Sequence, residues 1–125
     1  MMSTIVLIED NHNNAKLVTK ILEAYGHTVH HACNALSGLH AVQEIRPDLV
    51  LLDFGLPDLD GKVVANRLCH LTFTRDIPII AFTADTTTLT RRLAISYGCR
   101  DVITKPIDTR AFPEQIASHL NLATV

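Results

Sequence analysis

The sequence predicts an α/β fold in which a doubly wound, five-stranded parallel sheet carries helices on both faces. Five short apolar runs rich in β-branched residues recur along the chain, and segments with helical periodicity separate them. Parallel strands need right-handed crossovers, which place helices over the faces of the sheet. Residues 49–52 and 77–82 are apolar without alternation, as expected for strands that are buried on both faces.

The strands are expected at residues 4–8, 28–32, 48–52, 78–82 and 101–104. The first helix is indicated by Val18, Ile21, Leu22 and Tyr25, whose helical spacing places them on one face. The next three helices are expected at residues 35–45, 61–71 and 87–97. The second ends before a proline and the fourth before a glycine, which are typical helix-end signals.

The fifth helix is expected at about residues 108–122, with Phe112, Ile116 and Leu120 on one face. Pro113 lies where a regular first turn would already use its backbone N–H, and proline has none. The start of this helix is therefore expected to be distorted or late.

Length and composition limit the function classes. A chain of 125 residues is the size of one domain, so residues 1–125 are expected to form a single domain with no room for an effector domain. The net charge of −2 gives no cationic surface for nucleic acid or an anionic membrane, and the apolar runs are too short to span a bilayer. Three widely spaced cysteines and no signal-peptide pattern indicate a reducing cytoplasm.

Charged and hydroxyl residues follow four of the expected strands. Glu9 and Asp10 follow the first strand, Asp53 the third, Thr83 the fourth and Lys105 the fifth. In an open parallel sheet, ligands bind outside the carboxyl ends of the strands. Taken alone, the acids are ordinary helix caps, the threonine a strand residue and the lysine a surface residue. The conjunction of all of them at one edge indicates a site.

The chemistry that these residues suggest is phosphoryl transfer, which depends on positioning and charge neutralisation. Clustered carboxylates need a hard divalent cation with oxygen ligands, for which Mg²⁺ is the best candidate. Asp53 would attack phosphorus. Lys105 would neutralise the transferring oxygens, and the Thr83 hydroxyl would donate a hydrogen bond to one of them.

Nearly the whole chain resembles the receiver domains of two-component response regulators. The motifs that carry the resemblance are IVLIEDN at 5–11, PDLVLLD at 47–53, LPDLDG at 56–61, FTA at 82–84 and ITKP at 103–106. The resemblance implies a flavodoxin-like (CheY-like) fold with strand order 2-1-3-4-5. It also implies phosphorylation of Asp53 by a sensor histidine kinase or a histidine phosphotransfer protein, with an obligatory divalent metal.

The resemblance also implies roles for individual residues. Asp10, Asp53 and the backbone carbonyl of Gly55 would bind Mg²⁺ directly, and Glu9 would act through water; Mn²⁺ is expected to substitute. Thr83 would be the switch residue through its hydroxyl group. Lys105 would supply the positive charge that pairs with the phosphoryl oxygens. The Lys105–Pro106 bond is expected to be cis, and Ala84 to be suitably small beside the phosphoryl group. Gly55 and Asp85 flank the site and are expected to govern water access and thus phosphoryl lifetime.

One position departs from the family pattern. Many receivers carry a tyrosine or phenylalanine three residues before the lysine, and this chain has Val102. Valine has no ring to turn inward, so coupling of Thr83 to the face formed by the fourth helix, fifth strand and fifth helix is expected to be weaker or to take another route. That face is also where a homodimer or a downstream target protein could bind.

The resemblance implies a signalling protein that promotes its own phosphorylation and dephosphorylation, and not an enzyme in the usual sense. It would act by phosphorylation-dependent binding or by passing the phosphoryl group onward. Three alternatives remain: an aspartyl-phosphate phosphatase, a flavin-binding module, and a receiver-like module that is never phosphorylated. Such phosphatases commonly carry an acid two residues after the nucleophile, where this chain has Gly55. An acidic site does not suit a flavin phosphate.

Other residues favour plainer roles. His27, His30 and His31 lack ligands at metal-binding spacing and are expected to be solvated or partly packed. Cys99 is expected to be a small buried hydrophobe. Arg91 and Arg92 are expected on a solvated helix face that could contact a partner.

Overall fold

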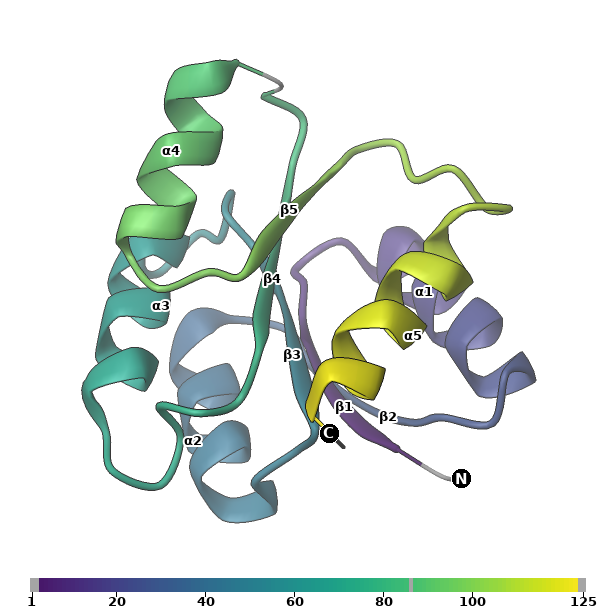
Figure 1. Cartoon of the computed structure of the whole chain (residues 1–125), viewed down its shortest axis with the longest axis horizontal. Helices are drawn as coiled ribbons and strands as arrows, with labels where there is room; N and C mark the ends of the chain where they lie inside the picture. The colour runs from purple at the N-terminus through teal and green to yellow at the C-terminus, as the bar shows by residue number, and fades with distance from the viewer. Residues whose placement is uncertain (1–2, 86, 124–125) are drawn as a thin grey trace.

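The computed structural model of the chain describes residues 3–85 and 87–123. Strands and helices alternate along the chain (Figure 1). They are β1 (Thr4–Ile8), α1 (His12–Ala24), β2 (Thr28–Ala32), α2 (Ala35–Ile45), β3 (Leu49–Asp53), α3 (Gly61–His70), β4 (Ile79–Thr83), α4 (Thr88–Ser96), β5 (Asp101–Thr104) and α5 (Phe112–Ala123). In the described part of the chain, no helix has both the length and the apolar character that a membrane crossing requires.

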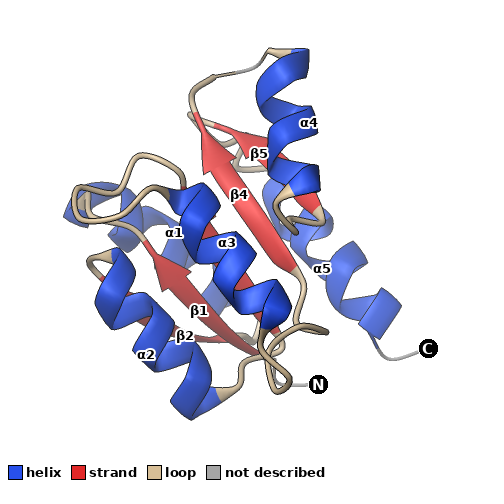
Figure 2. Ribbon diagram, turned by 90° about the vertical axis from the view of Figure 1, so that its left-hand side faces the viewer, coloured by secondary structure: helices blue, strands red, loops and turns tan. Residues whose placement is uncertain are grey.

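The strands form one parallel sheet in the order β2-β1-β3-β4-β5. Helices α1 and α5 cover one face, and α2, α3 and α4 cover the other (Figures 1 and 2). Because β2 lies on one side of β1 and β3 on the other, the strand order reverses between β1 and β3. The predicted flavodoxin-like topology is confirmed, and the reversal marks the edge where ligands bind in such sheets.

Each face of the sheet has its own hydrophobic core. Under α1 and α5, Leu22, Phe82 and Phe112 are fully or almost fully buried, and the two phenylalanine rings stack with centroids 5.7 Å apart. Under α2, α3 and α4, Ile8 and Leu52 belong to the second core. Because alternate residues of the central strands point to opposite cores, residues 5–8 of β1 and 49–52 of β3 are all apolar. Only their carboxyl ends can carry charged side chains.

Several helix and strand ends differ from expectation by one residue. Strands β3 and β4 extend to Asp53 and Thr83, because the ladder continues past the apolar runs. Thr87 is the N-cap of α4 and accepts a hydrogen bond from the backbone N–H of Thr90, so the helix begins one residue later than predicted. Tyr25 lies at the C-cap of α1 and is 65% exposed, so the apolar face of this helix ends earlier than its spacing suggests.

The late start of the fifth helix is confirmed. Asp108 accepts hydrogen bonds from the backbone N–H groups of Arg110 and Ala111 in a turn that precedes α5. Helix α5 begins only at Phe112, which places Pro113 in the first turn, where no intrahelical N–H bond is needed. The Lys105–Pro106 bond is cis, as the resemblance implied.

Candidate functional site

The carboxyl ends of β1, β3, β4 and β5 surround a cleft. All six residues predicted for the site line it, namely Glu9, Asp10, Asp53, Gly55, Thr83 and Lys105. The topology explains this convergence, because the strands are parallel and their last residues lie at one edge of the sheet. The cleft is also lined by Asp60, Lys62 and Thr90, which were not predicted to lie there.

Three carboxylates gather in this cleft. Glu9 and Asp10 directly follow β1, and Asp53 is the last residue of β3. One oxygen of each lies within 4.8 Å of the other two. Glu9 is 1% exposed and Asp53 4%, whereas Asp10 is open to solvent. Carboxylates held so close together and partly out of water repel one another, so the cluster favours a bound cation.

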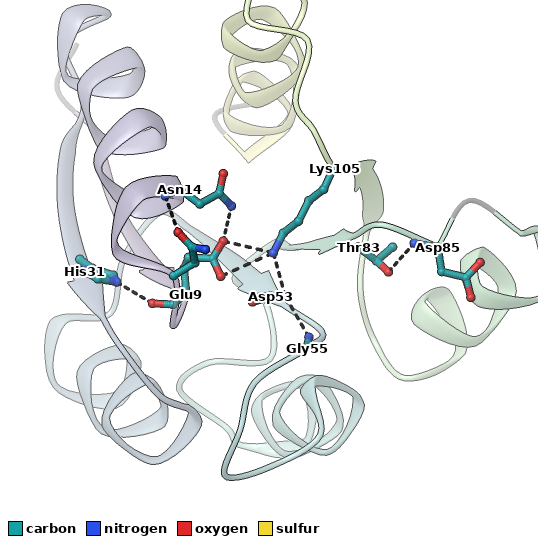
Figure 3. Close-up of polar contacts among 9 residues, drawn as sticks. Glu9, Asn14, His31, Asp53, Gly55, Thr83, Asp85 and Lys105 are labelled. Atoms are coloured by element: carbon teal, nitrogen blue, oxygen red, sulfur yellow. Dashed lines mark hydrogen bonds and ion pairs between the residues drawn. The ribbon is translucent and has the colours of Figure 1, made fainter.

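Lys105 supplies a cation from the protein itself. Its Nζ lies 3.1 Å from Glu9 Oε1 and 3.1 Å from Asp53 Oδ1 (Figure 3). Burial alone lowers the pKa of Lys105, but its contacts with Asp53 and Glu9 outweigh burial and raise the pKa above its ordinary value. The ammonium therefore keeps its charge and joins the ends of β1, β3 and β5.

The two buried acids differ in how readily they hold a proton. Burial and the neighbouring Asp53 carboxyl raise the pKa of Glu9. Burial also acts to raise the pKa of Asp53, but hydrogen bonds from Glu9, the Gly55 amide and Lys105 outweigh it and lower this pKa. The Gly55 N–H donates to Asp53 Oδ1 at 2.9 Å. The lowered pKa favours the ionised form of Asp53, which is the form that a nucleophile or metal ligand needs.

Glu9 is held by groups from two neighbouring elements. Asn14, in the first turn of α1, donates its side-chain amide to Glu9 Oε1 (Figure 3). His31, in β2, places Nε2 2.6 Å from the backbone carbonyl oxygen of Glu9. The Glu9 backbone and carboxylate are thus fixed separately. Neither contact was predicted, and His31 had been expected only to be solvated or partly packed.

Thr83 connects the site to the start of α4. Its Oγ1 accepts a hydrogen bond from the Asp85 N–H at 3.1 Å, which leaves the hydroxyl proton free to be donated elsewhere (Figure 3). The Asp85 carboxylate accepts from the Thr87 N–H at 2.9 Å and the Thr90 hydroxyl at 2.6 Å. The Thr90 and Thr87 bonds lower the pKa of Asp85. Asp85 therefore ties the Thr83 hydroxyl to the N-terminus of α4.

The loop from Phe54 to Asp60 is anchored by two of its aspartates. Asp58 accepts hydrogen bonds from the N–H groups of Ala35 at 2.8 Å and Leu36 at 3.0 Å, which lie at the N-terminus of α2. Asp60 caps α3 by accepting from the Lys62 N–H at 2.9 Å. These anchors hold the loop that carries Gly55 beside Asp53.

The donor set fits a hard divalent cation. Mg²⁺ prefers oxygen ligands and is usually held by one or two carboxylates together with water. Glu9, Asp10 and Asp53 offer three carboxylate oxygens close together, and exposed Asp10 keeps the cluster open to solvent. The site therefore has the chemistry of a magnesium site.

An acidic cleft with a half-buried lysine, at the carboxyl edge of a sheet ordered β2-β1-β3-β4-β5, places the chain in the flavodoxin-like class of α/β domains. The chain belongs to the response regulator receiver domain family, whose sequence profile matches residues 5–117. It is thus a receiver domain of two-component signalling.

Individual relatives agree with this assignment. The polar-differentiation response regulator DivK of Brucella anthropi is 36% identical over 120 residues, which cover 96% of this chain and 98% of that protein. A putative response regulator from Chloroflexus aurantiacus has the same fold, with a TM-score of 0.92 at 21% identity, covering 97% of this chain and 99% of that chain. The receiver domain of a Pseudomonas aeruginosa sensor histidine kinase, solved with magnesium in its active-site cleft, matches with a TM-score of 0.88 at 25% identity, covering 97% of this chain and 99% of that chain.

Some contacts could not be found from the sequence, although weak signals existed. Asn14 and Lys62 lie in the first turns of helices that begin soon after Asp10 and Asp53, so both face the same sheet edge. His31 is paired with Leu7 in the β1–β2 register, which places it close to Glu9.

Val102 is 7% exposed and packs in the core under α4. Its effect on signal coupling stays a prediction.

Proposed function

We propose that this protein is a single receiver domain that accepts a phosphoryl group on Asp53 from a sensor histidine kinase or a histidine phosphotransfer protein. The phosphorus–nitrogen bond of the donor phosphohistidine breaks as the bond between phosphorus and an Asp53 oxygen forms. The response regulator DivK of Brucella anthropi, which is matched over 98% of its length, supports a response-regulator role for this chain. Three free cysteines, at 33, 69 and 99, support a location in the cytoplasm.

The observation that carries the proposal is the environment of the Asp53 carboxylate. It is buried, its pKa is lowered, and its Oδ1 already accepts the Gly55 N–H at 2.9 Å and lies 3.1 Å from Lys105 Nζ. An ionised oxygen positioned by fixed donors is suited to attack phosphorus in line.

Mg²⁺ would be held by Asp10, Asp53 and the Gly55 carbonyl, with Glu9 acting through water, and Mn²⁺ would substitute. When bound, the ion neutralises negative charge on the acids and on the transferring oxygens. Lys105 would turn its ammonium to a phosphoryl oxygen, and the Thr83 hydroxyl would donate to another. The domain would thus promote its own phosphorylation and dephosphorylation, with Gly55 and Asp85 governing access of water to the phosphoryl group.

Receiver domains act through kinases or phosphotransfer proteins and through downstream targets. For this chain we propose a histidine-containing donor and a downstream protein, which is either a binding target or the next phosphoryl acceptor. The face formed by α4, β5 and α5 is the candidate surface for the target or for a homodimer. Asp101 connects the three elements there, because its carboxylate lies 3.6 Å from Arg91 Nη1 and 2.9 Å from His119 Nε2.

The proposal is tested by intact mass after incubation with acetyl phosphate, with and without Mg²⁺. The expected result is a single phosphoryl adduct that requires Mg²⁺ and is absent in Asp53→Asn. Asp60→Asn is a matched control, because Asp60 lines the same cleft and asparagine keeps the helix cap. It should still form the adduct. A wild-type protein that binds Mg²⁺ but gains no phosphoryl group, from acetyl phosphate or from a phosphorylated histidine donor, would contradict the proposal and favour an unphosphorylated interaction module.

A further inference from the structure

The Glu9 carboxylate has two side-chain partners of different chemistry. Lys105 Nζ lies 3.1 Å from Oε1 and 3.5 Å from Oε2. The Asn14 amide donates to the same Oε1. Asn14 reaches the carboxylate from α1, and Lys105 reaches it from the segment after β5 (Figure 3). Glu9 is 1% exposed, so these protein groups replace most of its contact with water.

The two partners differ in what else they must do. The ammonium of Lys105 is shared, since it also lies 3.1 Å from Asp53 Oδ1. Under the proposed function, it turns to the phosphoryl oxygens and its contact with Glu9 weakens. Asn14 is fixed in place, because its own backbone N–H donates to the Asn11 side chain at 2.9 Å in the first turn of α1. Its amide can therefore keep holding Glu9 when Lys105 is engaged elsewhere.

A neutral amide is well suited to this task. It donates a hydrogen bond to the carboxylate without a positive charge that would repel a cation, and without a negative charge that would add to the repulsion among the acids. His31 contacts only the backbone carbonyl of Glu9, at 2.6 Å, and so does not direct the carboxylate.

We propose that Asn14 is a positioning residue that orients the Glu9 carboxylate within the cluster of metal-binding carboxylates that Glu9 forms with Asp10 and Asp53. The part of this inference that concerns Lys105 rests on the proposed function. The hold of Asn14 on Glu9 does not depend on phosphorylation.

The test compares Asn14→Ala with Asn13→Ala. Asn13 is the preceding residue in the same helical turn and is exposed, and alanine favours a helix in both variants. The dissociation constant for Mg²⁺ is measured by calorimetry on the folded variants, without any phosphodonor. Removing a group that orients a metal-site residue typically weakens metal binding about 10- to 100-fold, so Asn14→Ala should raise the dissociation constant by about tenfold and Asn13→Ala should leave it unchanged.

A second readout separates positioning from general damage. The initial rate of phosphorylation by acetyl phosphate is measured as Mg²⁺ is varied. For Asn14→Ala, the Mg²⁺ concentration that gives half the maximal rate should rise about tenfold, while the rate at saturating Mg²⁺ stays within about twofold of the wild type. A structural defect would instead lower the maximal rate at an unchanged Mg²⁺ requirement, and that result would overturn the proposal.

The two proposals fail in distinguishable ways. If Asp53 is never phosphorylated, the wild type forms no adduct, but the calorimetric difference between Asn14→Ala and Asn13→Ala persists. If the dissociation constants of both variants match the wild type while adducts form normally, Asn14 has no positioning role and the proposed function stands.

Discussion

Lys105 Nζ lies 3.1 Å from Asp53 Oδ1 and thereby joins the end of β3 to the segment after β5. The same nitrogen lies 3.1 Å from Glu9 Oε1. A single ammonium therefore partly neutralises the two buried acids of the cluster. Because a divalent cation would bind the same acids, the lysine both stabilises the metal-free site and competes with the metal.

Replacing Lys105 should therefore have opposite effects on metal binding and on phosphorylation. Lys105→Met keeps an unbranched side chain and removes the charge. We expect tighter Mg²⁺ binding in calorimetry, because the competing ammonium is gone. Phosphorylation by acetyl phosphate at saturating Mg²⁺ should be about 100-fold slower, since the developing charge loses a positioned donor.

Lys62→Met is the control for this experiment. Lys62 lines the same cleft, but its Nζ is paired with Asp60 at 4.0 Å and lies outside the acidic cluster. We expect both quantities to stay within about twofold of the wild type. A Lys105→Met protein with a normal phosphorylation rate would show that Lys105 serves only to hold the acids together.

His27 should make stability depend on pH. It is half-buried, its Nδ1 has no hydrogen-bond partner among the described residues, and burial lowers its pKa below the ordinary 6.5. Between the lowered folded value and 6.5, the unfolded chain binds more protons than the folded one, so stability rises with pH across that window. The contribution of neutral His27 is complete above 6.5 and is lost as pH falls.

The urea midpoint of the wild type should therefore increase between about pH 5.5 and about pH 7 more steeply than that of His27→Gln. His40→Gln is the matched control, because His40 is exposed on α2 and its ring pairs with exposed Glu44, at 3.2 Å. Its pH profile should follow the wild type. Equal slopes for wild type and His27→Gln would contradict the prediction.

The cysteines should differ sharply in reactivity. Burial raises the pKa of the Cys99 thiol to about 12, and Cys99 is 3% exposed, whereas Cys33 is exposed. From its raised pKa alone, alkylation of Cys99 by iodoacetamide at pH 8 should be about 1,000-fold slower in the folded protein than in urea, where the thiol regains its ordinary pKa of 9.0. In the folded protein it should also be far slower than alkylation of exposed Cys33. Peptide mass spectrometry over time measures both rates, and unfolding in urea should bring them together. Equal rates in the folded protein would contradict the small, buried role of Cys99.

The sheet edge and its polar residues could be predicted because the positions of the strands follow, to within one residue, from the apolar runs. Apolar runs fix where β1, β2 and β5 lie, and parallel strands necessarily deliver their last residues to one edge. Strands β3 and β4 ended one residue late in the structure, because polar Asp53 and Thr83 still join the ladder. Their neighbours continue the bonding, with Phe54 N–H donating to Phe82 O at 3.1 Å and Lys105 N–H to Thr83 O at 2.9 Å. Hydropathy cannot detect such a polar extension.

The contacts made by helix and loop side chains could not be predicted in the same way. An asparagine near the start of a helix ordinarily serves as a helix cap. The positions of Asn14 and Glu9 in the sequence do not show that the Asn14 side chain instead donates a hydrogen bond to the Glu9 carboxylate. The sequence around Asp58 is typical of a turn. In the structure, however, its carboxylate accepts hydrogen bonds from the backbone N–H groups of Ala35 and Leu36, at the start of α2. Both contacts depend on how helices dock on the sheet, which local sequence does not determine.

Gly38 sets how closely α2 approaches β1, and its replacement should show the energetic consequence. A Cβ at this position would lie 2.5 Å from Ile8 Cδ1 and 2.7 Å from Ile8 Cγ1. Ile8 is fully buried and directly precedes Glu9, so it has little room to move. Overpacking of this kind costs about 1–3 kcal/mol, against a gain of about 1 kcal/mol from replacing glycine by alanine in a helix.

We therefore expect Gly38→Ala to lower the free energy of unfolding in urea and to weaken Mg²⁺ binding, because a displaced Ile8 also displaces Glu9. His40→Ala, on the exposed face of the same helix, controls for helix propensity and should not weaken Mg²⁺ binding. A more stable Gly38→Ala protein would mean that α2 can move away from β1 at little cost. If Mg²⁺ binding were then also unchanged, the position of Glu9 would depend on Asn14 and His31 and not on the packing beneath it.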